Sequence, residues 1–380
     1  MWRSRLWTAR RSWTRAPPPP YSPPVEPREP ARHAVSRNAR IAAVLCGVVL
    51  VLGGAFAAGF LLGGEDDTSS GEGELDRAVA PLTGLEVTGE AVARLDRPAL
   101  AAKIDNSEAA VPQTGLEDAD IVYEIRVEGV TRFLAVFHSA EVGDIGPIRS
   151  ARTSDPALLA ALNTPLFANS GGNPGVLTAL QSADAFNVGD SITPDSYYRS
   201  PEREAPHNLY AKSADLWALA PVGSRPPNPQ FSYLAGEEPA AGEAAAGATT
   251  SDADFEVAYV WDDRRGGWAR YEYGLPQTDE SGRQLAPTNV VVLDVQYSQS
   301  QADATSPEAL TVGSGSAMVF VGGRVVSGTW ARDDPAAPFE LIAADGSTIR
   351  LQPGTTWISL VDPGSAAVLD EQTAQQLLGS

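Results

Sequence analysis

The chain has 380 residues, a formal net charge of −20 at pH 7 and 43% hydrophobic residues, with 35 glycines and 30 prolines. Its length exceeds that of one ordinary domain, and the glycine and proline content predicts many turns and linkers. One cysteine excludes a disulfide framework and a cysteine-based zinc site, while three histidines argue against a His-rich metal site. The acidity argues against nucleic acid as a partner. We therefore expect no metal and no cofactor.

The N-terminal segment is basic and is followed by a long apolar run. Residues 1–40 are rich in Arg and Pro, with nine arginines against Glu26 and Glu29, and we expect them to be disordered. Ile41–Gly64 contains 24 residues without a charge, enough at ~1.5 Å per residue to cross a bilayer core of ~30 Å. The positive-inside rule keeps the basic side in the cytoplasm. The sequence therefore predicts a single-pass protein of the cell membrane with an extracytoplasmic body.

A cleaved signal or a lipoprotein signal is the alternative for this apolar run. A signal core is usually about 7–15 residues, shorter than this one. Lipid attachment at Cys46 would leave 18 apolar residues ahead of the body, and Leu45 is a poor neighbour for such a cleavage site. An uncleaved transmembrane helix is the favoured interpretation. The acidic, Gly- and Ser-containing residues 65–80 are expected to be a linker.

Residues 81–225 alternate strand and helix signals, which predicts an α/β part with a mixed sheet and flanking helices. Apolar or alternating runs predict strands at 100–105, 121–127, 131–139 and 164–170. Cap residues, prolines near the first helical position and apolar runs predict helices at 154–162, 176–183 and 213–220. A short turn joins the second and third strands, so we expect them to form a hairpin.

The C-terminal part has a different character. Residues 226–254 read as a low-complexity linker, and short β-rich runs at 255–362 predict a mainly antiparallel β part. The sequence FVGGRVV at 320–326 carries a Gly-Gly hairpin signal. Residues 363–380 are expected to be a terminal helix or tail. Six aromatic residues can either stack on sugar rings or fill the core, and the core is favoured: Trp261, Trp268, Tyr271, Tyr273, Trp330 and Trp357.

Two strand–loop–helix units carry the candidate binding residues. The loop GPIRSAR (146–152) contains Arg149 and Arg152, and NSGGNPG (169–175) contains Asn169 and Asn173. If the two strands are parallel neighbours, both loops meet at the carboxyl edge of the sheet, where open α/β folds bind ligands. Guanidinium groups bind carboxylate or phosphate, and a helix start adds N–H donors. The alternative is structural: both arginines pair with the chain's own Asp105, Glu124 or Asp155.

A polar loop supplies further candidates. His207 and Asn208 lie in SPEREAPHNLYAKS (200–213), and His207 is suited to act as a general base or to orient a ligand. Stapling the loop is its structural alternative. Asp105, in KIDN (103–106), is a second candidate for proton transfer, and Glu124 is expected on the opposite face of the neighbouring strand. A carboxylate pair suits glycoside hydrolysis, but no spacing identifies the pair. His138 is expected at the edge of the core.

Several of these motifs together resemble one known family. KIDN, GLEDADIVYEIRVEGVTRFLAVF, GPIRSAR, APHNLY, GTW and PGTTWISLV, spread over most of residues 81–362, resemble the YerB-like family of bacterial envelope proteins. The resemblance implies two domains of unknown function on a lipoprotein or anchored protein outside the cytoplasmic membrane. It implies no reaction and no ligand. The long apolar run and the lack of a clear lipoprotein cleavage motif depart from the lipoprotein pattern.

Three kinds of function follow from these observations. The leading hypothesis is an envelope protein that binds an anionic cell-wall polymer, glycan or partner protein through Arg149, Arg152, Asn169, Asn173, His207 and Asn208. The second is a hydrolase or transferase of a wall phosphodiester or glycoside, with His207 or Asp105 moving protons and the arginines stabilising negative charge. The third is a non-catalytic scaffold for wall-synthesis proteins. Whether the protein is an enzyme stays open at this point.

Overall fold

The computed structural model describes residues 76–379 except 237, 253–254, 303 and 305, and these residues belong to one compact unit, Gly73–Ser380. The predicted tail 1–40, the membrane segment Ile41–Gly64 and most of the linker lie outside the described residues. Within the described part, no helix is long and apolar enough to cross a membrane. The first described strands are β1 (Arg77–Val79) and β2 (Glu86–Thr88), an antiparallel pair followed by α2 (Glu90–Arg94).

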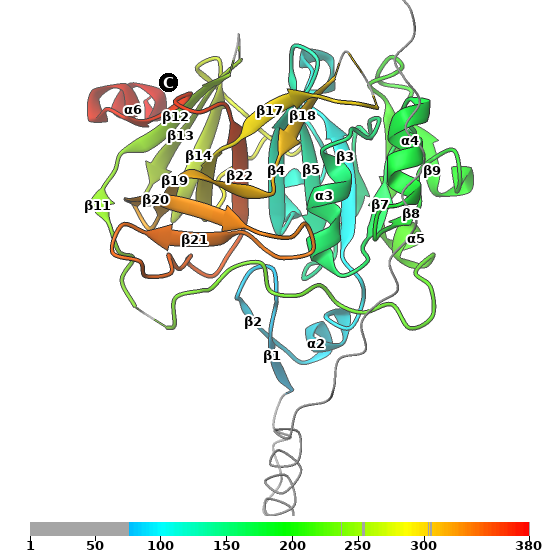
Figure 1. The fold of residues 1–380 in the computed structure, drawn as a ribbon, viewed down its shortest axis with the longest axis horizontal. Coiled ribbons are helices and arrows are strands. Elements are labelled where there is room, and N and C mark those ends of the chain that lie inside the picture. Colours follow the sequence, from blue (N-terminus) through cyan, green and yellow to red (C-terminus); the bar gives the residue numbers. More distant parts are fainter. Residues whose placement is uncertain (1–75, 237, 253–254, 303, 305, 380) are drawn as a thin grey trace, which may run out of the picture. The chain divides into compact units, whose positions relative to one another are not determined.

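One mixed sheet of eleven strands organises the fold (Figure 1). Its order is β11 (Glu243–Ala244), β20 (Arg324–Arg332), β19 (Gly313–Val321), β16 (Asn289–Asp294), β22 (Thr356–Val361), β4 (Ile121–Arg126), β5 (Thr131–Phe137), β3 (Leu100–Asp105), β7 (Leu166–Ala168) and β8 (Phe186–Asn187), with β21 (Glu340–Ala343) beside β20. Strand β22 pairs in parallel with both β16 and β4. The sheet therefore continues from the first half of the chain into the second.

The first face of this sheet is covered mainly by a second, five-stranded sheet. Its order is β15 (Leu275–Pro276), β14 (Gly267–Glu272), β13 (Phe255–Asp262), β12 (Gly247–Asp252) and β23 (Ala366–Leu369). Aromatic rings fill the space between the sheets: Trp268 lies 5.5 Å from Phe320, and Phe133 lies 5.1 Å from Trp357. Farther along, the same face packs against α5 (Ser213–Trp217) and the small sheet of β6 (Asp144–Ile145), β10 (Leu209–Lys212) and β9 (Tyr197–Arg199).

The second face packs against helices and a hairpin. These elements are α3 (Asp155–Leu159), α4 (Pro174–Gln181), and the pair β17 (Gln296–Gln299) and β18 (Pro307–Leu310). In Figure 1, α3 lies in front of β3 and β5. All seven residues of β5 are buried because both faces of the sheet are covered. This double cover explains why the central strands read as nearly continuous apolar runs, so the few charged residues in them are informative.

Several of the strands and both hairpins predicted from local signals are confirmed. The strands at 100–105, 121–127 and 131–139 correspond to β3, β4 and β5, and β4 and β5 form the expected antiparallel hairpin. The FVGGRVV hairpin is confirmed as β19 and β20, with Gly322 and Gly323 at φ 57° and 72°, a region that favours glycine. Trp268, Trp330 and Trp357 are at most 2% exposed, so they belong to the core, whereas Tyr273 is 57% exposed.

The α/β description of the first half is only partly right, because the described residues are mostly β and the helices are few and short. The predicted helix at 154–162 is divided into α3 and a 3₁₀ turn, η4 (Ala160–Leu162), which ends at Asn163 with a left-handed φ of 59°. The second half is mainly antiparallel as expected, except for the parallel pairings of β22. The residues at 363–380, expected to be a terminal helix or tail, include β23, and in the described part they are helical only in α6 (Glu371–Leu378), where Asp370 caps the first turn.

The strands of the two strand–loop–helix units are not parallel neighbours, so the condition under which their loops were expected to meet is not fulfilled. Strands β5 and β7 lie on opposite sides of β3, antiparallel and parallel to it respectively. After β5 the chain does not cross directly into a helix. It first returns along β3, where Ile148 forms an antiparallel bridge with Ile104. The GPIRSAR loop consequently still reaches the carboxyl end of β3.

The predicted linker at 226–254 contains regular structure. Strands β11 and β12 lie in it, and β12 is a central strand between β13 and β23. Its small residues are required by packing: a Cβ on Gly247 would lie 2.2 Å from the carbonyl oxygen of Tyr259, and Ala248 is fully buried. A composition of alanine and glycine therefore indicated close strand packing here rather than a mobile connection.

Candidate functional site

One buried carboxylate gathers three of the sequence motifs. Asp105 is the last residue of β3, and its side chain is 1% exposed. Its Oδ2 lies 3.0 Å from Nε of Arg149 and 2.7 Å from Nδ1 of His207. Its Oδ1 accepts a hydrogen bond of 3.1 Å from the backbone N–H of Ser107. KIDN, GPIRSAR and APHNLY thus meet at Asp105.

Backbone hydrogen bonds hold these segments in place. The N–H of Arg149 donates to the carbonyl of Lys103 over 2.8 Å, and the N–H of Ile148 donates to the carbonyl of Leu209 over 2.6 Å. The arginine loop therefore lies between the end of β3 and the start of β10. His207 comes two residues before Leu209, which brings its ring to the same edge.

The imidazole of His207 is anchored through one nitrogen. Besides Asp105, its Nδ1 lies 3.0 Å from Oγ of Ser107, and the side chain is 24% exposed. A carboxylate that accepts from Nδ1–H leaves Nε2 of a neutral ring as a proton acceptor. Ser107 and Asp105 approach the same nitrogen, so this is not the serine–histidine–aspartate arrangement, in which they approach opposite nitrogens. The contacts with Asp105 and Ser107 nevertheless fix the orientation of the ring.

A buried arginine that the sequence analysis missed lies beside this group. Arg132 of β5 is directly opposite Asp105 in the sheet register and is 6% exposed. Its NH1 donates to the carbonyl of Ser150 over 3.3 Å, but its Nε has no hydrogen-bond partner among the described residues. Burial, followed by the guanidinium groups of Arg152 and Arg149, lowers the pKa of Arg132 to about 10. Arg132 is therefore still a cation at neutral pH.

The two predicted arginines both pair with carboxylates of the chain. Arg149 contacts Asp105, as the structural alternative expected, without forming a hydrogen bond through its Nε. Arg152 forms a fork with Glu128, with Nε–Oε1 and NH2–Oε2 distances of 2.9 Å each, and this partner was not expected. The backbone N–H of Arg152 donates to Asp155 over 2.7 Å. The structural interpretation therefore accounts for both side chains.

The charges at this edge do not cancel. Four cations, Lys103, Arg132, Arg149 and Arg152, face three carboxylates, Asp105, Glu128 and Asp155, which leaves one net positive charge before any protonation of His207. Lys103 and Asp155 form a fully buried pair at 2.7 Å. No salt bridge to Arg132 occurs among the residues that the structure describes. We call these four cations the cationic cluster. It lies in a protein whose overall charge is −20.

The three predicted asparagines hold loops rather than face the cluster. Asn169 accepts from the N–H of Gly171 and donates to Asn187, each over 2.9 Å. Asn173 caps α4 by accepting from the N–H of Val176 over 2.9 Å. Asn208 accepts from Arg199 over 2.8 Å. Their amides are used within the loops, whereas the hydroxyls of Ser150 and Ser170, 3.5 Å apart, are partly exposed at the same edge.

Glu124 faces the other side of the sheet, as expected. Its carboxylate accepts from Arg270 over 2.7 Å, from the indole of Trp357 over 3.1 Å and from the hydroxyl of Tyr259 over 3.2 Å. Arg270 is fully buried, and its guanidinium carbon lies 4.9 Å from the centre of a Trp357 ring. This ion pair joins β4 to the five-stranded sheet, so we assign it to structure.

His138 is also structural, as expected for a core-edge histidine. It is fully buried, and its Nε2 lies 3.2 Å from the carbonyl of Leu95 and 3.1 Å from that of Arg97. Burial lowers the pKa of His138 to about 4, which leaves the ring neutral at physiological pH. It is separate from the residues around Asp105.

Among the missed residues, Arg132 had a recognisable signal. It is the single charge in the apolar run TRFLAVF, although its position beside Asp105 follows from the β3–β5 pairing, which the predicted hairpin did not specify. A charge in a strand that is otherwise entirely apolar needs either a partner or a function. Ser107 and Glu128 lie in polar turns and had no comparable signal.

Family models place the chain among proteins without an assigned activity. A model described as "Protein of unknown function (DUF3048) N-terminal domain" matches residues 82–223, and the corresponding C-terminal domain matches 248–358. The chain belongs to this family, and the resemblance to YerB-like proteins is confirmed. It is 29% identical over 303 residues to "Putative lipoprotein YerB" of Bacillus subtilis (strain 168), covering 77% of this chain and 88% of that protein.

A solved structure supports the same relationship. The fold is similar to the crystal structure of the YerB protein from Bacillus subtilis, with a TM-score of 0.67 and 25% sequence identity. The match covers 77% of this chain and 100% of the solved one. Neither relative's description names a ligand or a reaction, so the site has to be interpreted from its own chemistry.

Proposed function

We propose that this protein is anchored on the outer side of the cytoplasmic membrane and binds an anionic group of a cell-wall polymer, glycan or envelope protein at the cationic cluster. The lipoprotein description of the relative supports the location, as does the apolar run Ile41–Gly64 after a basic tail. The net positive charge around Asp105 supports the choice of an anion.

The anchor itself has a direct test. If Ile41–Gly64 is a membrane-spanning anchor, Cys46→Ala leaves the protein in the membrane fraction with an unchanged mass. If the anchor is a lipid on Cys46, the unchanged protein begins at a lipidated Cys46, and the same substitution prevents both the lipid attachment and the cleavage before it, so the mass changes by the lipid and by residues 1–45. Fractionation and mass spectrometry of the two proteins distinguish these outcomes.

Arg132 is the observation that carries the proposed binding function. A buried donor without a partner costs about 1–3 kcal/mol relative to a satisfied one, and a cation costs more. An anion in contact with Arg132 and Arg149 would satisfy the Nε–H groups that lack hydrogen bonds in both residues. Guanidinium pairs suit carboxylate and phosphate groups because each presents two parallel donors. The hydroxyls of Ser150 and Ser170 supply neutral donors at the rim.

Sedimentation of full-length protein with purified cell-wall material tests this binding. We expect Arg149→Gln to reduce retention at least tenfold, and Arg132→Gln to do the same if it folds. Retention of the unchanged protein should fall as salt rises, because the attraction is ionic. The matched control is Arg264→Gln, which removes the same charge from an exposed position outside the cluster.

Circular dichroism and thermal unfolding of each variant separate binding from folding. A folded Arg149→Gln protein with full retention contradicts the proposal. A variant that unfolds instead favours the structural interpretation of Arg149, and retention must then be judged on Ser150→Ala with Ser170→Ala. Unchanged retention in that double variant also contradicts binding at this edge.

Proton transfer by His207 is a second candidate function, favoured by the 2.7 Å contact that orients its ring through Asp105. In this mechanism Nε2 of His207 accepts a proton from an attacking water, and the cationic cluster stabilises the developing negative charge. Release of products from wall phosphodiesters or glycosides should then be lost in His207→Gln, while retention on wall material persists. The absence of turnover in the unchanged protein on both substrate types would exclude this function.

A further inference from the structure

A cavity lies at the other end of the main sheet from the cationic cluster. It has a volume of about 220 Å³ and is lined from both halves of the chain, including Leu116 and Val122 from the first half and Leu285 and Trp357 from the second. We call it the inter-half cavity. These four side chains are at most 3% exposed and form an apolar floor.

Strand direction separates this cavity from the cationic cluster. Strands β3 and β4 both run antiparallel to β5, so they point the same way. Asp105 is the last residue of β3, whereas the cavity is lined by residues at the start of β4 and by Thr356, the first residue of β22. The two sites are therefore at opposite ends of the strands.

The mouth of the inter-half cavity carries both signs of charge. Glu117, Arg265 and Arg283 line it. Oε2 of Glu117 is buried and has no hydrogen-bond donor in the described part of the chain, while Oε1 lies 3.4 Å from NH2 of Arg283. Burial, with the neighbouring carboxylates of Asp279 and Asp118, raises the pKa of Glu117. A donor or a cation placed at Oε2 would remove this penalty.

The two arginines retain donors for a ligand. Arg283 is 66% exposed and pairs through Nε with Asp279 at 3.1 Å, so its guanidinium edge is only partly used. Arg265 is 44% exposed and pairs through Nε with Asp262 at 3.0 Å. A carboxylate entering the mouth can reach guanidinium N–H groups without breaking a buried contact.

We propose that the inter-half cavity binds a free amino acid or a short peptide with an aliphatic side chain, in its zwitterionic form. The ammonium group would lie against Oε2 of Glu117, the carboxylate against Arg283 and Arg265, and the side chain on the floor formed by Leu116, Val122 and Leu285. A neutral sugar matches the site less well: its hydroxyls could donate to Glu117, but it has no anion for the arginines.

Calorimetric titration of the full-length protein with leucyl-alanine tests the proposal. Because each charged end has its own partner, N-acetylation and C-terminal amidation should each weaken binding at least tenfold. Glu117→Gln should weaken binding of the free dipeptide at least tenfold and leave the weak binding of its N-acetyl form unchanged. Arg283→Gln should show the mirror-image pattern, acting on the free acid and not on the amide. Glu86→Gln, on exposed β2, is the matched control.

Several outcomes overturn the proposal. They are the absence of heat at millimolar dipeptide, equal binding of the acetylated or amidated forms, and tighter binding of N-acetylglucosamine than of the dipeptide. If Glu117→Gln destabilises the protein, the proposal is still tested by comparing the affinities of the unchanged protein for the free, acetylated and amidated dipeptides. Loss of dipeptide binding in Arg149→Gln would place the ligand at the cationic cluster instead and would also contradict the proposal.

Discussion

At the scale of single residues, the contacts of Asp105 change how the arginines of the GPIRSAR loop are interpreted. Arg149 is not an isolated cation waiting for a ligand, because Asp105 already pairs with it and with His207. The surplus charge belongs to Arg132, which is buried one strand away. The meeting of KIDN, GPIRSAR and APHNLY at one end of the sheet was therefore partly predictable from the sequence. The identity of the cation that carries the surplus charge was not, since it depends on which carboxylate is already shared.

The lowered pKa of Glu128 predicts that the free energy of unfolding depends on pH. Burial alone would raise the pKa of Glu128, but hydrogen bonds from Arg152 and Ser306 outweigh it and lower the pKa to about 2. A carboxylate with a depressed pKa in the folded state contributes stability above its unfolded value, 4.5, and loses it as pH falls toward 2. Glu128→Gln should therefore cost about 1 kcal/mol at pH 7, a figure reduced for solvent screening of this partly exposed group.

Urea unfolding at pH 7, 5, 4 and 3 measures this effect. The difference between Glu128→Gln and the unchanged protein should narrow steadily below pH 4.5. Glu86→Gln, an exposed control, should show no such trend. A gap that is constant across this range would mean that the Glu128 charge does not contribute to stability.

We expect the buried ion pair of Lys103 and Asp155 to contribute more to the free energy of unfolding than Glu128 does. Both side chains are fully buried, and burial lowers the pKa of Lys103. Asp155→Asn leaves an ammonium group without its counter-charge and should cost about 3–5 kcal/mol. Lys103→Met combined with Asp155→Leu should cost less than Asp155→Asn alone, since it removes both charges. Urea midpoints of the variants check this order, and a double variant worse than the single one contradicts it.

At the scale of elements, local patterns were predictable and long-range pairings were not. The β4–β5 hairpin and the Gly322–Gly323 turn follow from a few adjacent residues, because turn chemistry fixes them. The position of β22 beside β4 depends on contacts such as Glu124 with Trp357, 233 residues apart, and no local pattern encodes it. The separation of β5 and β7 by β3 was unpredictable for the same reason, because a strand–loop–helix pattern does not specify which strands pair with each other.

The assignment of β12 as a central strand, in a segment whose composition suggested a linker, can be tested by substitution. Because β12 pairs on both sides, each backbone N–H points to a neighbouring strand, and proline removes one such donor. Thr249→Pro should destabilise the protein by at least about 3 kcal/mol. Thr249→Ala, which keeps the N–H, should cost much less. If thermal unfolding shows the two variants to be equally stable, the segment is a linker as its composition suggested.

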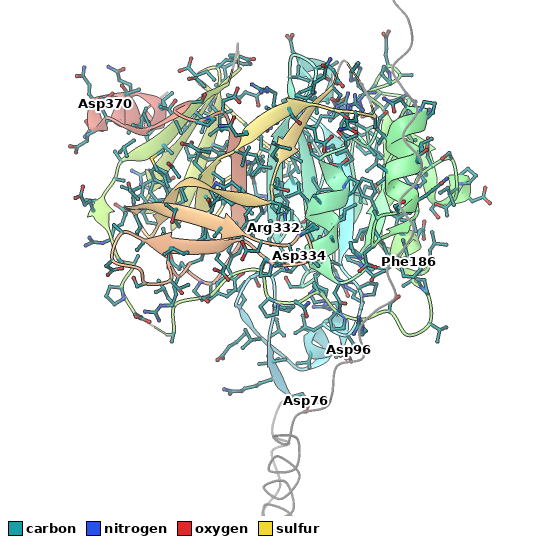
Figure 2. The ribbon with its side chains drawn as sticks, in the orientation of Figure 1. Asp76, Asp96, Phe186, Arg332, Asp334 and Asp370 are labelled. Carbon is teal, nitrogen blue, oxygen red and sulfur yellow. The ribbon has the colours of Figure 1, made fainter. Side chains whose placement is uncertain are left out.

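At the scale of the whole described body, the two matched domains share one sheet. Besides β22, Arg332 connects the halves: it is 2% exposed, and its NH2 donates to the carbonyl of Ala157 in α3 over 2.7 Å. Figure 2 labels Arg332 beside Asp334. The predicted boundaries at 81–225 and 255–362 resemble the ranges matched by the family models. These ranges divide the sequence, but the hydrogen-bonded sheet crosses between them.

A shared sheet predicts one cooperative unfolding transition. Calorimetry of the full-length protein should show a single peak for the described body, with equal calorimetric and van't Hoff enthalpies. A chain that ends at Thr355 lacks β22 and should lose the near-ultraviolet dichroism of both halves. A chain that ends at Asp370 lacks only α6 and should stay folded. Two separate transitions, or a folded first half in the shorter chain, would indicate independent domains.

The order of synthesis gives β22 a further consequence. The ribosome makes the chain from its N-terminus, and β22 is the last strand of the main sheet to be made. Until it emerges, β4 and β16 each lack one strand partner, and an open strand edge promotes aggregation. A chain that ends before β22 would therefore expose two unpaired strand edges, those of β4 and β16. A chain that includes β22 pairs both edges with this one strand. Completion of the main sheet therefore depends on synthesis of the chain through Val361.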